Sequence, residues 1–359
     1  MNDSAQQLEM NQMLELVVSR NASDLHLISG VPPMLRIDGE LAPIPSEQVL
    51  TPDRIEKLLK AVMTPEQVEQ LTVNRELDFS LSFSERARFR VNAYTQKQTI
   101  AAAFRSIPLD IPAIDALGLP PILHNFTSMR QGFILVTGPT GHGKSTTLAS
   151  MLDEINTSYA EHIVTIEDPI EFVIKPKRSI ISQREMNNDT HSWSVALRSV
   201  LREDPDVVLV GEMRDYETIA AALTVAETGH LVFATLHTNS ASQTVDRVVD
   251  VFPSEQQDQV KLQLSNVLEA VVSQRLVPAI SGGRVVAHEM MLATTAIRTA
   301  IREGKTHQID SIIQTSSEVG MNTMEASLAQ LVRDGKITIE SAKSFAIRPE
   351  QLSRMVHRE

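Results

Sequence analysis

The chain has 359 residues, of which 42% are hydrophobic and 22% are charged, an ordinary composition for a folded protein that argues against wholesale disorder. Its formal charge of −12 disfavours a nucleic-acid partner, because proteins that bind the phosphate backbone of nucleic acids normally present a positive surface. It contains no cysteine, which excludes disulfides, thiol catalysis and Cys-ligated zinc.

The first 106 residues predict a small α+β domain. Apolar residues recur at helical spacing over residues 5–19, which predicts an amphipathic helix. Thr51 and Pro52 are typical of a helix N-cap followed by proline at the first helical position. Strands are predicted at Leu77–Phe83, Ala87–Tyr94 and Ile100–Arg105.

Residues 107–121 contain four prolines and a glycine, which predicts a linker. Beyond it, short apolar runs alternate with helical segments, the pattern of a parallel α/β sheet over residues 122–290. The runs are Phe133–Val136, Ile163–Ile166, Val207–Val210 and Leu231–Ala234, and the helical segments are 144–157, 192–202 and 216–227. Residues 291–359 show helical periodicity and predict a helical C-terminal subdomain.

No apolar stretch approaches the roughly 20 residues that span a bilayer. The polar first residues also lack the basic and apolar regions of a signal peptide. We therefore expect a cytoplasmic protein whose membrane association comes through a partner.

A phosphate loop of the form GxxxxGK[ST] follows the first apolar run of the second domain. Backbone N–H groups in such a loop turn onto phosphate oxygens at the positive end of a helix. We expect Lys144 to meet the β- and γ-phosphates of ATP and Ser145 to hold Mg²⁺, whereas His142 at a variable position is expected to face solvent. The nucleotide-contacting run is Gly138, Pro139, Thr140, Gly141, His142, Gly143, Lys144, Ser145 and Thr146.

Carboxylates follow two of the predicted strands. Glu212 comes directly after Val207–Gly211, where a Walker-B acid would ligate Mg²⁺ through water. Glu167, Asp168 and Glu171 follow another strand, and one of them is expected to orient the attacking water as general base. Spacing alone does not choose among the three, and a solvated acidic turn is the alternative.

Histidines and arginines complete the candidate set. His230 and His237 bracket a strand, and each is interpreted either as a satisfied core residue or as a γ-phosphate contact. Arg88, Arg90 and Arg105 lie on strands of the first domain, where they are either solvated or contact phosphate as arginine fingers do.

Together these motifs resemble the secretion ATPase superfamily and, within it, the type IV pilus retraction ATPases. In the first domain the resemblance rests on Ser23–Leu27, Arg36–Gly39 and Arg88–Asn92. In the second it rests on Leu201–Asp206 running into Gly211–Asp215, on residues 165–172 (the Asp box) and on residues 228–238 (the His box).

The resemblance implies a PAS-like first domain and a RecA-like ATPase domain. It implies that Glu171 is the catalytic carboxylate and Glu212 the Walker-B acid, and that His230 and His237 belong to the His box. Arg90 and Arg105 would complete the nucleotide site. It further implies a homohexameric ring that hydrolyses ATP with Mg²⁺ on an inner-membrane pilus platform protein, with a paralogous retraction ATPase as a further partner.

Residues 296–303 resemble the C-terminal helix motif of retraction ATPases, with Arg298 and Arg302 one helical turn apart. Thr299 and Ala300 stand where the family usually has Asn and Leu, so an accessory retraction ATPase is an alternative.

Three more functions are compatible with a phosphate loop: an assembly or type II secretion motor, a DNA translocase, and a regulatory hexamer without turnover. The absence of a Cys-x-x-Cys insertion and the short N-terminal region disfavour the assembly motor. The negative charge of the chain disfavours the translocase. The complete set of Lys144, Ser145, Glu171 and Glu212 disfavours a hexamer without turnover.

Overall fold

A computed structural model describes residues 3–37, 39–45, 47–83, 87–107 and 110–356. The chain divides into two compact units, residues 1–110 and 111–359. The division falls inside the predicted linker. Part of that linker is nevertheless folded, because Ile114 and Leu119 are buried in the core of the second unit. Among the described residues no helix is long and apolar enough to cross a bilayer.

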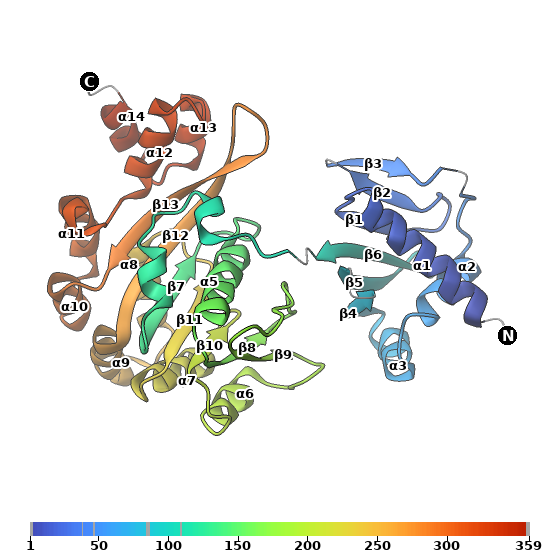
Figure 1. Ribbon diagram of the computed structural model, residues 1–359, viewed down its shortest axis with the longest axis horizontal. Coiled ribbons are helices and arrows are strands. Elements are labelled where there is room, and N and C mark those ends of the chain that lie inside the picture. Colours follow the sequence, from blue (N-terminus) through green and yellow to red (C-terminus); the bar gives the residue numbers. More distant parts are fainter. Residues whose placement is uncertain (1–2, 38, 46, 84–86, 108–109, 357–359) are drawn as a thin grey trace. The chain divides into compact units, whose positions relative to one another are not determined.

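The described part of the first unit has a six-stranded antiparallel sheet, in the order β3-β2-β1-β6-β5-β4. Three helices contribute apolar side chains to a single core cluster on one face of this sheet (Figure 1). The elements are α1 (Asp3–Ser19), β1 (Asp24–Leu27), β2 (Met34–Ile37), β3 (Glu40–Pro43), α2 (Pro52–Lys60), α3 (Pro65–Asn74), β4 (Glu76–Phe83), β5 (Ala87–Gln96) and β6 (Thr99–Ile107).

Local sequence rules explain most of these elements. Met10, Met13 and Leu14 of α1 are buried, as the helical spacing predicted. Thr51 caps α2 by accepting a hydrogen bond from the N–H of Arg54. Helix α3 was not predicted, although Thr64 forms a capping box at its start; only Leu71 of this helix is buried, which leaves a weak apolar stripe.

The second unit is built on a seven-stranded sheet within the described residues, in the order β13-β12-β7-β11-β10-β8-β9. Neighbouring strands are parallel except for the antiparallel pair β12 and β13. The strands are β7 (Gly132–Thr137), β8 (His162–Glu167), β9 (Ile180–Glu185), β10 (Val207–Val210), β11 (Leu231–Leu236), β12 (Leu268–Pro278) and β13 (Arg284–Leu292). Four of them contain the predicted apolar runs, whereas β9, β12 and β13 were not predicted.

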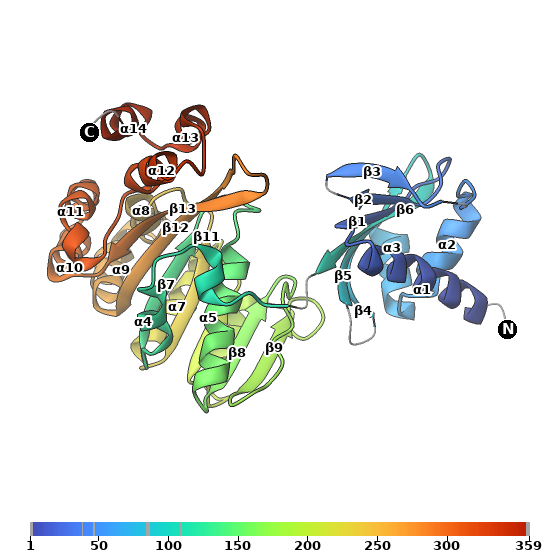
Figure 2. The same ribbon diagram turned by 45° about the horizontal axis from the view of Figure 1, so that its top comes forward.

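Helices cover both faces of this sheet and form two core clusters (Figures 1 and 2). One cluster contains η1 (Ile114–Leu117), α4 (Leu123–Thr127) and α5 (Lys144–Ser158). The second cluster contains α6 (Trp193–Val200), α7 (Tyr216–Glu227), α8 (Ala241–Asp250), α9 (Ser254–Val267), α10 (Thr295–Arg302) and α11 (Ile309–Thr315). The parallel strands therefore end at a common edge, between helices on both sides.

The last part of the chain is helical, as predicted. Helices α12 (Met324–Arg333), α13 (Ile339–Phe345) and α14 (Pro349–Val356) form their own core cluster with Val277 of β12 and Ala287 of β13. Short 3₁₀ turns, η2 (Thr306–Gln308) and η3 (Ser317–Val319), connect the preceding helices. The C-terminal helices are thus continuous with the sheet through the β12–β13 hairpin.

Candidate nucleotide site

The phosphate loop connects the end of β7 to the start of α5. Gly138 and Gly143 both have positive φ angles, 140° and 83°. A Cβ atom on Gly138 would lie only 2.3 Å from the carbonyl oxygen of Gln274, and one on Gly143 would lie 3.1 Å from its side-chain nitrogen. The loop therefore passes so close to β12 that these two positions require glycine. Backbone N–H groups at the start of α5 are left free to bind an anion.

Lys144 folds back across this loop. Its Nζ donates to the carbonyl oxygens of Gly138 at 2.8 Å and Pro139 at 3.0 Å, and only 8% of the residue is exposed. Burial lowers the pKa of Lys144, while the carboxylates of Glu171 and Glu212 oppose that shift. Within the described ranges its ammonium forms no ion pair with a carboxylate. A buried cation with only neutral partners suits a bound phosphate.

Glu212 and His237 lie at the same edge of the sheet, just after β10 and β11. His237 Nε2 is 3.3 Å from Glu212 Oε2, and its Nδ1 is 3.4 Å from the hydroxyl of Thr140. Arg214 pairs with the second Glu212 oxygen at 2.5 Å. His237 therefore connects the phosphate loop to the predicted Walker-B carboxylate, so the two motifs that sequence spacing suggested do meet here.

The structure separates the three carboxylates that follow β8. Glu167 is 9% exposed and accepts hydrogen bonds from Thr165 Oγ1 at 2.7 Å and Gln183 Nε2 at 3.2 Å. Burial raises the pKa of Glu167 to about 7. Glu171 and Asp168 are exposed, and the Glu171 carboxylate is the one that acts electrostatically on Lys144. Glu171 is thus the member of the cluster best placed to meet water beside a phosphate.

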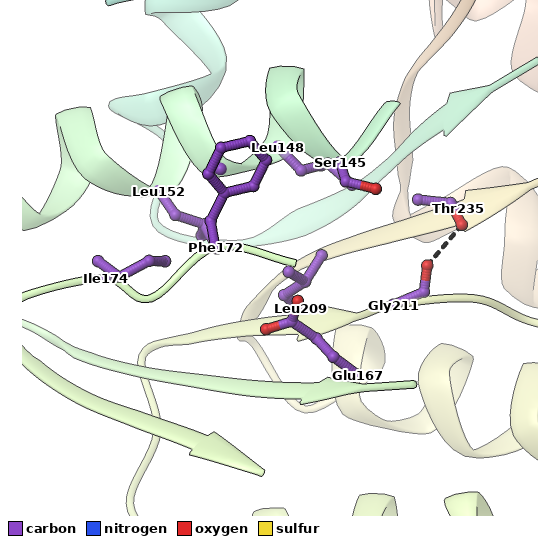
Figure 3. A pocket seen from close by; sticks show the side chains of 10 residues that line it. Ser145, Leu148, Leu152, Glu167, Phe172, Ile174, Leu209, Gly211 and Thr235 are labelled. Carbon is purple, nitrogen blue, oxygen red and sulfur yellow. Dashed lines mark hydrogen bonds between the residues drawn. The ribbon is translucent and has the colours of Figure 1, made fainter. Parts of the chain in front are cut away.

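A small pocket adjoins this edge (Figure 3). Ser145, Leu148 and Leu152 line it from α5, and Glu167 lies opposite them at the end of β8. The remaining lining comes from Ala149, Phe172, Ile174, Leu209, Gly211 and Thr235. Thr235 Oγ1 donates to the Gly211 carbonyl oxygen at 2.5 Å, which ties the end of β11 to the residue before Glu212. The pocket is mainly apolar and has polar groups where the strands end.

His230 does not join this cluster. It precedes Leu231, which pairs with Gly132 at the start of β7, whereas the phosphate loop follows the opposite end of that strand. Seven strand positions separate it from His237, or roughly 20 Å at the rise of a β-strand. Its Nδ1 lies 2.9 Å from Thr228 Oγ1 and 3.1 Å from the Val225 carbonyl oxygen, at the end of α7. The expected γ-phosphate contact by His230 is therefore not met within its own unit.

His142 was expected to face solvent, and this expectation was wrong. The residue is half-buried, and its Nδ1 accepts a hydrogen bond from the N–H of Leu276 at 2.9 Å. Its ring lies 6.2 Å from that of Phe345, centroid to centroid. Desolvation lowers the pKa of His142, with smaller contributions from Arg275, Lys144 and Arg284.

Sequence reasoning missed Gln274, which braces the phosphate loop from β12. Its side-chain oxygen accepts from Thr147 Oγ1 at 2.9 Å, and its side-chain nitrogen donates to the His142 carbonyl oxygen at 2.8 Å. The neighbouring Ser273 Oγ is 2.8 Å from Thr137 Oγ1. The run Ala270–Val272 carries the β-branched signal of a strand, but nothing in the spacing places that strand beside the loop.

The candidate arginines belong to the first unit. Arg90 on β5 and Arg105 on β6 are directly opposite each other in register, and both are exposed. Arg105 Nε donates to Asp24 at 3.0 Å, whereas the closest Arg90–Asp78 approach is 4.0 Å. Like charges opposite each other on a sheet are unfavourable, and the neighbouring carboxylates of Asp24 and Asp78 partly offset this repulsion.

The two arginines of the C-terminal motif differ in their environments. Arg298 Nη1 donates to the carbonyl oxygens of Ser265 at 2.9 Å and Asn266 at 3.0 Å, and Nη2 pairs with Glu269 at 2.8 Å. Arg302 is exposed. The predicted basic stripe is therefore divided between one arginine that caps the end of α9 and one that faces solvent.

Comparisons with known proteins agree with this geometry. The family described as Type II/IV secretion system protein matches residues 2–344. The chain is 48% identical over 343 residues to the Type IV pilus retractation ATPase PilT of Pseudomonas aeruginosa, covering 96% of this chain and 99% of that protein. It is 37% identical to the Type IV pilus ATPase PilU of the same organism, covering 97% and 91%.

Solved structures give the same result. A crystal structure of the pilus retraction motor PilT with bound ADP superposes with a TM-score of 0.91 at 47% identity, covering 96% of this chain and 98% of that one. The ATPase DotB of Legionella pneumophila superposes with a TM-score of 0.83 at 29% identity, covering 94% and 95%. The predicted fold class and family resemblance are confirmed: the chain belongs to the Type II/IV secretion system protein family.

Proposed function

We propose that this chain is an ATP-hydrolysing motor that powers the retraction of type IV pili. The observation that carries the ATPase half is Lys144, a buried ammonium held at the start of α5 by two neutral carbonyls, with Glu171 and Glu212 close enough to affect its pKa. The retraction half is supported by relatives named for pilus retraction and twitching motility, each 48% identical to this chain.

In this mechanism Lys144 and the N–H groups of the phosphate loop bind the β- and γ-phosphates. Glu171 accepts the proton of the water that attacks the γ-phosphorus. His237 lies between Thr140 and Glu212 and contacts both. If a bound phosphate displaced Thr140 from His237, the contact between His237 and Glu212 would change as well. The reaction would break the bond between the β- and γ-phosphates and release ADP and phosphate.

Mg²⁺ fits the residues at this edge. Ser145 and Glu212 offer hard oxygen donors of the kind that Mg²⁺ prefers. No cluster of three or more His, Cys, Asp or Glu among the described residues could hold a metal alone, so phosphate oxygens and water would supply the remaining ligands, with Glu212 acting through water. The ion would neutralise charge on the phosphates during transfer.

The proposal includes assembly as a homohexamer on the cytoplasmic face of an inner-membrane platform protein, with a paralogous retraction ATPase as a further partner. Arg90 and Arg105 would bind phosphate from the first unit. Their exposure and paired register support this role. An accessory retraction ATPase is a second candidate, because Thr299 and Ala300 stand where the retraction family usually has Asn and Leu.

The test is deletion of the gene in the native host, with pilus number and the length of fluorescently labelled pili followed over time. We expect many pili that do not shorten, restored by the wild-type chain but not by Glu171→Gln. Cells without pili would overturn the proposal in favour of an assembly motor. Normal retraction would favour the accessory role. In that case, deleting the paralogous ATPase as well should abolish retraction.

A further inference from the structure

The carboxylate of Glu171 is not fixed by contacts of its own. The residue is exposed, and within the described residues its side chain forms no hydrogen bond or ion pair. Its N–H makes a long hydrogen bond, 3.4 Å, to Glu167. The position of this carboxylate is therefore set mainly by the backbone of the loop that carries it, residues 168–174.

Two side chains of β9 hold that backbone on either side of Glu171. Glu185 Oε2 accepts a hydrogen bond from the N–H of Ile170 at 3.1 Å. Gln183 Nε2 donates to the carbonyl oxygen of Phe172 at 2.8 Å. The residues immediately before and after Glu171 are thus both tied to one strand.

Gln183 makes two further bonds that stiffen the same loop. Its Oε1 accepts from the N–H of Ile174 at 2.8 Å, and its Nε2 also donates to Glu167 at 3.2 Å. Because Gln183 is two residues from Glu185, the two side chains lie on the same face of β9. They pair in register with Thr165 and Glu167 of β8, so four polar residues share one face of two adjacent strands.

A polar face of this kind is costly in a sheet. Glu185 is 2% exposed and Glu167 is 9% exposed, and burial of polar groups is unfavourable unless they are hydrogen-bonded. Glu185 also accepts from Asn188 and from Ile170, so its burial is offset partly by the loop itself. Apolar residues here would pack without that cost, but they would leave the loop unheld.

We propose that Gln183 and Glu185 are positioning residues that fix the location of Glu171 by holding the backbone of the residues on either side of it, Ile170 and Phe172. The inference rests on the proposed function, in which Glu171 is the general base. An attacking water must lie within hydrogen-bond reach of this carboxylate. A displacement of about 1 Å in such a group costs on the order of 100-fold in rate, so loosening the loop should slow hydrolysis without weakening nucleotide binding.

The test compares Gln183→Ala with Arg184→Ala in the full-length chain. Arg184, the next residue of β9, bonds Ser199 at 2.9 Å and Glu203 at 2.7 Å instead of the loop. Its removal should therefore destabilise the same strand without releasing Glu171. Steady-state kcat and KM for ATP, ADP affinity by calorimetry and the thermal midpoint are measured for both.

For Gln183→Ala we expect kcat to fall by about 10- to 100-fold while KM and ADP affinity stay near wild type. Arg184→Ala should keep the wild-type kcat, even if its thermal midpoint falls as much as that of Gln183→Ala. Should Gln183→Ala fold poorly, Gln183→Met keeps the volume without the hydrogen bonds. Glu185→Gln retains an acceptor for Ile170 and should keep most of the activity that Glu185→Ala loses.

A second comparison separates this inference from the proposed function. Wild-type hydrolysis by Glu171→Gln would refute Glu171 as the base, whatever Gln183 does. Loss of hydrolysis in Glu171→Gln, with wild-type kcat in Gln183→Ala and Gln183→Met, would overturn the positioning role alone. If both hold, adding Gln183→Ala to Glu171→Gln should lower kcat no further, because residues that act as one unit are not additive.

Discussion

His142 accepts a hydrogen bond from the N–H of Leu276, 2.9 Å away, and this contact joins the phosphate loop to strand β12. The His142 ring also lies 6.2 Å from the ring of Phe345 in α13. A residue of the nucleotide loop is therefore in contact with both the sheet and the C-terminal helices.

We expect Phe345→Ala to weaken ADP binding only when His142 is present. Aromatic pairs contribute about 0.5–1.5 kcal/mol beyond their burial, so the coupling should be roughly 2- to 10-fold in affinity. A double-mutant cycle with His142→Ser, read by calorimetry, isolates this term. Equal effects of Phe345→Ala in both backgrounds would show that the two rings do not communicate.

Lys144→Ala should abolish tight nucleotide binding. The substitution removes a buried ammonium whose partners in the loop are carbonyl oxygens, and a bound phosphate would lose its cation. The expected loss is about 3 kcal/mol of binding free energy, or roughly 100-fold in ADP affinity. Calorimetry measures it directly, and unchanged affinity would contradict the assignment of Lys144.

Gly138→Ala should damage the loop more than Gly141→Ala. A Cβ on Gly138 would lie 2.3 Å from the Gln274 carbonyl oxygen, whereas one on Gly141 would meet nothing within 4 Å. Both have positive φ, so both substitutions cost about 1–2 kcal/mol of backbone strain, but only the first adds a clash with β12. Thermal midpoints and ADP affinities of the two variants should therefore differ, and similar values would argue against the close approach.

Arg298→Ala and Arg302→Ala should differ in their effect on the free energy of unfolding, because only Arg298 makes structural contacts. Arg298 caps the end of α9 and pairs with Glu269, so its loss should cost about 1–3 kcal/mol of unfolding free energy. Arg302 is exposed, and its replacement should change stability by about 0.5 kcal/mol or less and leave ATPase activity intact. If Arg302 has a role in the motor, cells with Arg302→Ala will lose pilus retraction although stability and ATPase activity are unchanged. Normal retraction in these cells would show that Arg302 is a surface residue with no role in retraction.

Glu167→Gln should reduce the dependence of stability on pH. Burial raises the pKa of Glu167 to about 7 from its ordinary value of 4.5, so the folded chain binds this proton more tightly than the unfolded chain. The stabilisation is full below about pH 4.5 and is lost as the pH rises through about 7. It amounts to about 3 kcal/mol. Denaturant unfolding at pH 5 and pH 8 should show a smaller difference for the variant than for the wild type.

Glu289 provides the control for that measurement. Burial also raises its pKa to about 7, and its side chain accepts from the N–H of Ala241 instead of bonding the loop after β8. Glu289→Gln should therefore also reduce the pH dependence of stability over the same range, as expected of a second buried carboxyl that lies outside the loop after β8. An identical pH dependence of the unfolding free energy for wild type and Glu167→Gln would show that folding does not raise the pKa of Glu167.

Local patterns were enough to predict the strands that carry most of the site. Runs such as Val207–Val210 are short, apolar and β-branched because they are buried on both faces of a parallel sheet. The phosphate loop was recognisable because its spacing is dictated by backbone contacts to phosphate. Strand β9 was missed because Gln183 and Glu185 place polar side chains where a buried strand normally has apolar ones.

The sequence by itself determined that the chain has a phosphate loop, a carboxylate after β10 and an acidic cluster after β8, since each is a matter of residue order. Only the tertiary structure decided which members act together. Parallel pairing brings Glu212 and His237 to one edge and leaves His230 at the opposite edge, because the two ends of a six-residue strand are far apart. Burial, a property of the packed sheet, distinguishes the enclosed Glu167 from the open Glu171.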